Sequence, residues 1–217
     1  MPPVTVRSYQ PQDRAGVRSL CCDTGNLGEP VDGVVPDREI FADLLTRYYT
    51  DYEPQSTWVA ASGGAVGGYL TGCLDNRRYQ RVMRWHVVPQ AVGRGLARGL
   101  LVHPTTWRLI GAAVRTLQIG GWSEPSLAAP FPAHLHLNLR REWRGRQLGA
   151  QLVNRFVSHA AARGVRGVCA AVRGDNLPAC RFFQRLGFQE LHRHPVAWPS
   201  GSAEYRQHDR IIYAKAL

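Results

Sequence analysis

The chain has 217 residues, of which 44% are hydrophobic and 20% charged, and its formal net charge is +11. This length allows one large domain or two small ones, and the composition is that of a soluble globular protein, which argues against disordered and fibrous classes. No window approaches about 18 uncharged apolar residues, so no membrane span is expected, and the first ten residues lack an apolar signal core, so we expect a cytoplasmic protein.

The charge is distributed unevenly along the chain. The first 60 residues hold nine acids against five arginines, a net charge of −4, so the remainder carries +15. Lys215 is the only lysine, so the basic charge consists almost entirely of guanidinium groups, which suit planar recognition of phosphates. Nucleic-acid binding would explain such charge too, provided that basic residues interleave with aromatics on one surface, and it is kept as the minor alternative.

The five cysteines are odd in number and form no CxxC pair, so they are expected to be reduced and mostly buried, and no metal site is expected. In chain order, the first expected elements are a strand at 4–9, helices at 12–22 and 37–49, and strands at 57–61 and 65–73. The last two strands are joined by Ser62-Gly63-Gly64, which is a hairpin signal and predicts antiparallel pairing.

Residues 76–130 form a long insertion that is too apolar for a linker. Amphipathic helices are expected at 89–101 and 104–117. Basic amphipathic helices can contact membrane surfaces, but a lid that packs on the domain with solvated arginines is the preferred interpretation.

The last part of the chain predicts alternating strands and helices. The expected elements are strands at 133–139 and 167–172, a helix at 147–163, a second helix that Asp175 and Asn176 cap and Gly187 ends, and strands at 188–192 and 209–216. The whole chain, residues 1–217, is therefore expected to form one α/β domain with about seven strands and four or more helices.

The segment 144–150, Arg-Gly-Arg-Gln-Leu-Gly-Ala, lies between a predicted strand and the first turn of a helix. Free backbone N–H groups and the positive end of the helix dipole converge there, which suits a pyrophosphate, and Gly145 and Gly149 let the backbone approach the anion. Alone this pattern is weak, because many such turns bind nothing.

About thirty residues later comes the segment 176–188, Asn-Leu-Pro-Ala-Cys-Arg-Phe-Phe-Gln-Arg-Leu-Gly-Phe. Together the two segments resemble the GNAT superfamily of acetyl-CoA-dependent acyltransferases, which shows Arg/Gln-x-x-Gly-x-Gly/Ala at such a turn, then an Asn, then Phe-Tyr-x-x-Leu-Gly-Phe. The matching residues are Arg144, Gly149, Asn176, Phe182, Leu186, Gly187 and Phe188. The resemblance is specific over 133–189, and the order of the elements extends it over most of the chain.

Other features resemble bacterial acetyltransferases related to the C-terminal acetyltransferase-like domain of O-GlcNAc hydrolases, a lineage that includes domains of doubtful catalytic activity. These features are Tyr52-Glu53-Pro54 before a strand, the insertion that Asn76-Arg77-Arg78 opens, and Pro132-Ala133-His134-Leu135-His136. Two residues depart from the superfamily pattern. Gln147 replaces the middle glycine of the loop, and Phe183 replaces the tyrosine that many members use to protonate the CoA thiolate, which phenylalanine cannot do.

The resemblance implies a mixed, mostly antiparallel sheet with flanking helices, and acetyl-CoA or another short acyl-CoA as co-substrate without a metal. The implied cofactor-binding residues are Leu137, Asn138 and Leu139 through their backbone, then Arg144, Gly145, Arg146, Gln147, Leu148, Gly149, Ala150, Asn176 and Phe183. The implied chemistry is direct attack of an amine on the thioester.

A base near pKa 7 would help, because the attacking amine must be neutral. The string Ala-His-Leu-His makes His134 and His136 the candidates and resembles serotonin N-acetyltransferase, but the pair lies one residue nearer to the phosphate loop, so structural histidines remain equally possible. Glu53 and Asp51 are the other candidates to receive the proton or hold the amine.

We therefore expect an N-acetyltransferase for a primary amine of a small molecule or protein. Because the first helices form the acceptor side in this superfamily, the acidic excess of the first 60 residues predicts a cationic acceptor. A CoA-binding pseudoenzyme that serves as an interaction module is the alternative, and a homodimer is compatible with either function.

Overall fold

A computed structural model of the chain describes residues 3–121, 130–199 and 205–217. Within these residues the strands are β1 (Thr5–Ser8), β2 (Thr57–Ser62), β3 (Ala65–Cys73), β4 (Ala133–Leu139), β5 (Gly167–Arg173), β6 (Gln189–Pro199) and β7 (Tyr205–Ala216). The α-helices are α1 (Arg14–Thr24), α2 (Arg38–Arg47), α3 (Asn76–Val82), α4 (Val88–Ala97), α5 (Pro104–Gln118), α6 (Leu148–Ala161) and α7 (Leu177–Arg185).

The strands form one seven-stranded sheet in the order β1-β2-β3-β4-β5-β7-β6. Every neighbouring pair is antiparallel except β4 and β5, which are parallel. The β2–β3 hairpin forms because Gly63 and Gly64 both adopt positive φ angles, of 56° and 84°, which a tight turn requires. The predicted mixed, mostly antiparallel α/β sheet with flanking helices is confirmed.

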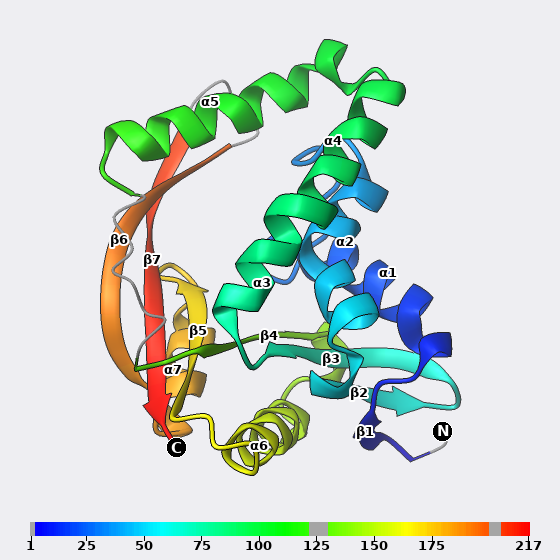
Figure 1. The fold of residues 1–217 in the computed structure, drawn as a ribbon, viewed down its shortest axis with the longest axis vertical. Coiled ribbons are helices and arrows are strands. Elements are labelled where there is room, and N and C mark those ends of the chain that lie inside the picture. The colour runs from blue at the N-terminus through cyan, green and yellow to red at the C-terminus, as the bar shows by residue number, and fades with distance from the viewer. Residues whose placement is uncertain (1–2, 122–129, 200–204) are drawn as a thin grey trace.

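Helices cover both faces of the sheet (Figure 1). α6 and α7 share one face, where Leu152 and Phe183 join a core with Leu135 from β4. α1 covers the other face and buries Val17 and Leu20 against β2 and β3. The alternation of side chains along β4 therefore sends leucines toward α6 and polar residues toward the N-terminal helices.

The insertion between β3 and β4 begins with more helix than the sequence indicated. α3 and α4 are joined by the π-turn Met83–Val87, so the chain is helical over residues 76–97, whereas the predicted helix was 89–101. Pro89 led to that boundary, since proline favours a first helical turn, but the π-turn carries the helix up to it. Residues 122–129 of the predicted insertion lie outside the described residues.

The insertion contacts the rest of the protein through α3, whose Tyr79 and Val82 pack against Tyr48, Tyr49 and Cys73, and through α4 and α5. Arg94 on α4 forms an ion pair with Asp43 of α2, and Arg98, directly after α4, forms one with Asp37 at 2.6 Å. α5 crosses from the end of α4 to the far end of the β6–β7 ribbon (Figure 1), where the Thr116 hydroxyl accepts a hydrogen bond from the Ala197 N–H at 3.0 Å. That the insertion acts as a lid stays a prediction.

The strands β6 and β7 are longer than the predicted 188–192 and 209–216. The segment 193–199 contains Pro195 and Pro199, and proline is rare inside central strands. β6 is the edge of the sheet, however, and an edge strand tolerates proline because one side of its backbone needs no ladder hydrogen bond.

Candidate active site

The strands β4 and β5 part in the middle of the sheet. Their parallel ladder covers only Ala133–Leu135 and 168–170, although both strands continue for several residues. A cavity of about 950 Å³ opens where they diverge, and it is lined by both strands, by the segment before α6, by α7 and by the C-terminal end of α1. The backbone of β4 over 136–139 therefore forms no ladder with β5 and is available to bind a ligand.

The segment before α6 lies at one end of this cavity. Gly145 has φ +76° and Gln147 has φ +58°, so the chain makes two left-handed steps before α6 begins at Leu148. Left-handed backbone favours glycine, which explains why a glycine is usual at the position of Gln147. The glutamine adopts this conformation at a modest cost in backbone strain. The first amides of α6 therefore face the cavity without helical partners and can bind an anion.

The predicted cofactor-binding residues mostly come together on this cavity. The structure places Leu137, Asn138, Leu139, Arg144, Gly145, Gln147, Leu148, Gly149, Ala150, Asn176 and Phe183 in its lining. Arg146 is exposed and lies outside the lining. The Asn138 amide donates to the Thr24 hydroxyl at 2.6 Å and thus ties β4 to α1, so its side chain has a structural role.

Asn176 and Phe183 are held by the packing of α7. The Asn176 side chain caps this helix by accepting from the Ala179 N–H at 3.2 Å. Phe183 is buried between Phe182 and Phe188, and its ring is stacked on Tyr213 with centroids 6.3 Å apart. Aromatic rings thus surround Phe183.

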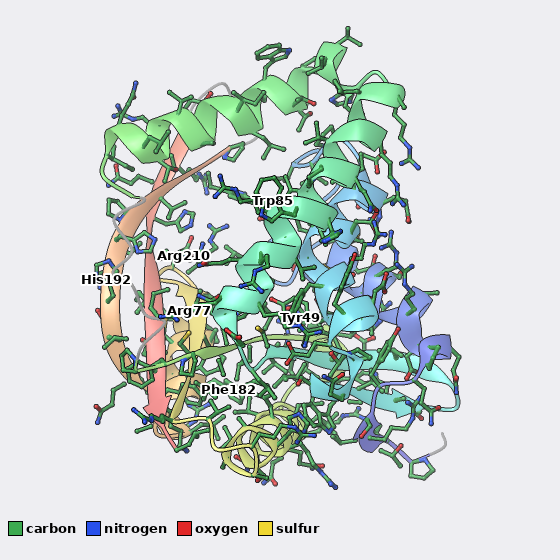
Figure 2. All side chains as sticks on the ribbon, in the orientation of Figure 1. Tyr49, Arg77, Trp85, Phe182, His192 and Arg210 are labelled. Carbon is green, nitrogen blue, oxygen red and sulfur yellow. The ribbon has the colours of Figure 1, made fainter. Side chains whose placement is uncertain are left out.

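The two histidines of β4 project toward the N-terminal helices. The Tyr49 hydroxyl lies 2.8 Å from His134 Nε2, and the His134 and His136 rings are 5.6 Å apart (Figure 2 shows Tyr49). Burial lowers the pKa of His134 from 6.5 to about 3, with smaller contributions from His136 and Arg210. Burial and then Arg210 lower the pKa of His136 to about 4. Both imidazoles are neutral at neutral pH, and only His136 lines the cavity.

The depressed histidine pKa values predict an acid-sensitive fold. The folded protein keeps both imidazoles neutral, whereas the unfolded chain binds protons below pH 6.5, so the free energy of unfolding is highest above pH 6.5 and falls toward pH 4. Urea unfolding at several pH values measures this slope. The double variant His134→Gln, His136→Gln is expected to flatten it, and an unchanged slope would contradict burial of neutral imidazoles.

Glu53 and Asp51 lie elsewhere. Buried Glu53 accepts hydrogen bonds from the Tyr48 hydroxyl at 2.7 Å, the Ser56 hydroxyl at 2.9 Å and the Leu74 N–H at 2.9 Å, so it joins the end of α2 to β2 and β3. Asp51 forms an ion pair with Arg14 at 3.1 Å. Neither carboxylate lines the cavity.

Apart from Glu29, the other acids of the first 60 residues form ion pairs. The ion pairs are Asp13 with Arg7, Asp23 with Arg38 and Arg140, Asp32 with Arg38, Asp37 with Arg98, Glu39 with Arg18, and Asp43 with Arg18 and Arg94. The acidic excess is thus largely used in ion pairs, and the cationic acceptor stays a prediction.

Sequence reasoning missed several residues near the histidines. Tyr49 and Tyr79 pack their rings on His134, with centroids 5.8 and 4.6 Å away, and Arg210 acts on both imidazoles from β7. The Tyr-Tyr-Thr-Asp-Tyr run at 48–52 was the only signal for an aromatic cluster. Tyr79 and Arg210 belong to elements whose position relative to β4 depends on the tertiary fold.

No helix in residues 3–121, 130–199 and 205–217 is long and apolar enough to cross a membrane. In the same residues, no group of three His, Cys, Asp or Glu side chains is placed to bind a metal ion. The cytoplasmic location and the homodimer stay predictions. The five cysteines are free thiols and all but Cys169 are buried, as expected.

Comparisons with known proteins agree with this geometry. Residues 109–188 match the model of the acetyltransferase (GNAT) family. The crystal structure of SsHAT is 26% identical, with 99% of this chain and 98% of that chain covered and a TM-score of 0.72.

Two solved structures of lower identity share the fold. An N-acetyltransferase from Staphylococcus aureus Mu50 is 12% identical, with a TM-score of 0.60 over 99% of this chain and 98% of that one. The structure of yncA from Salmonella typhimurium with its cofactor acetyl-CoA is 13% identical, with a TM-score of 0.58 over 99% and 94%. The closer resemblance to O-GlcNAc hydrolase domains stays a prediction. The motifs, the parted strands and these matches support a GNAT superfamily acetyltransferase, and the family model covers residues 109–188.

Proposed function

We propose that the chain transfers an acetyl group from acetyl-CoA to a primary amine of a small molecule or protein, by direct attack of the amine on the thioester. The observation that carries this proposal is the parting of β4 from β5 beside the free amides of the α6 N-terminus. One cavity of about 950 Å³ joins the two features, which suits a long ligand with phosphates at one end and a thioester at the other.

The residues of the cavity fit this co-substrate. The amides that follow Gln147 would hold the pyrophosphate, and Gly149 lets the start of α6 pack closely on its neighbours, since a Cβ there would lie 3.2 Å from Phe182 and 3.3 Å from Leu139. The backbone of 137–139 would bind the pantetheine arm and polarise the thioester carbonyl. His136 of β4 lines the cavity next to this backbone and is the side chain that would take the amine proton. Acetyl-CoA, when bound, supplies the activated acetyl group.

The proposal is tested by calorimetry with acetyl-CoA, followed by an assay of CoA release over a panel of amines. Binding together with release above the hydrolysis background is expected. Binding without release would favour a CoA-binding pseudoenzyme, which the residue at position 183 supports, because phenylalanine has no hydroxyl that could protonate the leaving thiolate.

The variant Gly149→Val is expected to weaken acetyl-CoA binding at least about tenfold, a loss of about 1.4 kcal/mol, because the new side chain crowds the anion-binding turn. Calorimetry measures this loss, and thermal unfolding shows whether the fold persists. Gly93→Val is the matched control, since a Cβ at Gly93 on α4 meets nothing within 4 Å. Equal affinity of the two variants would contradict the placement of the phosphates.

A further inference from the structure

Building on the function proposed above, we propose that the acceptor site takes weakly basic amines as neutral free bases, such as the α-amine of a peptide or of an apolar amino-acid amide, and discriminates against lysine side chains and polyamines. The proposal rests on which charges line the cavity and which face the histidines of β4.

The part of the cavity beside His136 is lined by uncharged side chains. From His136 it continues toward α1 and α2, along Cys21, Thr24, Leu45 and Tyr69. Burial raises the pKa of the Cys21 thiol to about 12, so this group carries no charge at neutral pH. An acceptor in this space meets apolar groups and neutral hydrogen-bonding groups.

No carboxylate from residues 3–121, 130–199 or 205–217 lines this space to hold an ammonium ion. Among the described residues that line the cavity, Asp175 is the only carboxylate, and it accepts hydrogen bonds of 3.1 and 2.7 Å from Arg173. Asp175 also lies beyond β5, on the side of α7. The acids of α1 and α2 form the ion pairs described above, so their charge is balanced outside the cavity.

Among the described residues, the charged side chain that lowers the pKa of both histidines is a cation, Arg210. Arg210 extends from β7 toward α3 (Figure 2), close enough to act on His134, His136 and Tyr79. The other titratable groups that face the pair are Tyr49, Tyr79 and, across the β3–β4 ladder, Cys73, and burial raises the pKa of each. None of these groups is an anion at neutral pH.

A cation that enters such a site loses hydration without gaining a counter-ion from the described residues, which is unfavourable, whereas a neutral amine loses little. The same environment that keeps the histidines unprotonated therefore selects the unprotonated acceptor. At about pH 7.5, roughly one in four peptide α-amines of pKa about 8 is neutral, compared with roughly one in a thousand lysine side chains of pKa about 10.4. Availability of the free base alone thus favours the α-amine about two hundredfold.

The transfer is balanced without a strong base. The lone pair of the neutral amine forms the C–N bond to the thioester carbonyl carbon, and the C–S bond breaks with its electron pair on sulfur. The second amine proton passes through His136 or water to the thiolate, so the products are the amide and the CoA thiol. His136 needs to accept this proton only after the nitrogen has become acidic through C–N bond formation.

The test compares three probes with the full chain and acetyl-CoA by CoA release: phenylalanine amide, Nα-acetyl-lysine amide and spermidine. At about pH 7.5, kcat/KM for phenylalanine amide is expected to exceed that for the other two by about a hundredfold or more. Between about pH 6 and the amine's own pKa, kcat/KM should rise about tenfold per pH unit. A preference for lysine amide or spermidine, or a break near pH 6.5 for every amine, overturns the inference.

A pair of variants supplies an independent readout. Leu45→Glu places a carboxylate on the cavity at a side chain that is 43% exposed, and it is expected to raise kcat/KM for lysine amide relative to phenylalanine amide about fivefold. Leu177→Glu on the outside of α7 is the matched control and should leave the ratio unchanged. Equal ratios in both variants contradict the inference. Acetyl-CoA binding with a lysine preference defeats only the inference, whereas no release with any probe defeats the proposed function as well.

Discussion

Replacing Phe156 by alanine is expected to lower the free energy of unfolding by about 3–5 kcal/mol. Phe156 of α6 is fully buried, packs edge-to-face on Trp58 with centroids 6.2 Å apart, and lies directly over Gly72 of β3, where a Cβ would come within 2.1 Å of the ring. Because Gly72 has no side chain that could fill the space, the cavity left by alanine stays open. Urea unfolding at neutral pH measures the loss.

The matched control for this variant is Asn154→Ala, at an exposed position on the same helix, which should change stability by no more than about 0.5 kcal/mol. A loss below about 1 kcal/mol in Phe156→Ala would show that α6 can collapse onto β3, and the close approach at Gly72 would then be wrong.

The second large effect is expected at Asp43. Its buried carboxylate binds Arg18 of α1 and Arg94 of α4, so it joins the two N-terminal helices to the insertion. Asp43→Ala leaves the Arg18 guanidinium, whose side chain is only 10% exposed, without its buried partner. We expect a loss of about 3–5 kcal/mol, as for other buried pairs that lose one member. Chemical denaturation measures it.

Glu39→Ala is the control for Asp43, since Glu39 binds the same arginine at 2.5 Å but is 66% exposed. It is expected to cost at most about 1 kcal/mol, because solvent screens an exposed pair. Similar losses in the two variants would show that burial of the Arg18–Asp43 pair is not what stabilises the helices.

The sequence was informative where local pattern and turn chemistry act together. The strands at 57–61, 65–73, 133–139 and 167–172 follow from apolar patterning bounded by turn residues, and the observed elements lie within one residue of these bounds. The glycine turn before α6 was predicted because glycines before an amphipathic helix have a direct physical meaning, and its binding of an anion stays a proposal. The structure adds that Gln147 itself adopts the left-handed conformation.

Other features depend on tertiary contacts that no local pattern reports. Glu53 looked available as a base, but three hydrogen bonds from separate elements fix it in the core. His134 and His136 looked like bases of ordinary strength, and only the surrounding aromatic rings and Arg210 reveal how weakly they bind protons. The acidic excess of the first 60 residues suggested a surface that attracts cations, because a net charge read from the sequence does not show which acids form ion pairs.

The position of the insertion in the sheet has a further consequence. Cys73 at the end of β3 and His134 near the start of β4 are register partners in an antiparallel ladder, so the segment between them leaves and re-enters the sheet at neighbouring points. In topological terms residues 76–130 are a very long hairpin loop. Chain length can therefore be gained or lost there without rethreading any strand, which makes this the place where related proteins could acquire different acceptor-side surfaces on an unchanged transferase sheet.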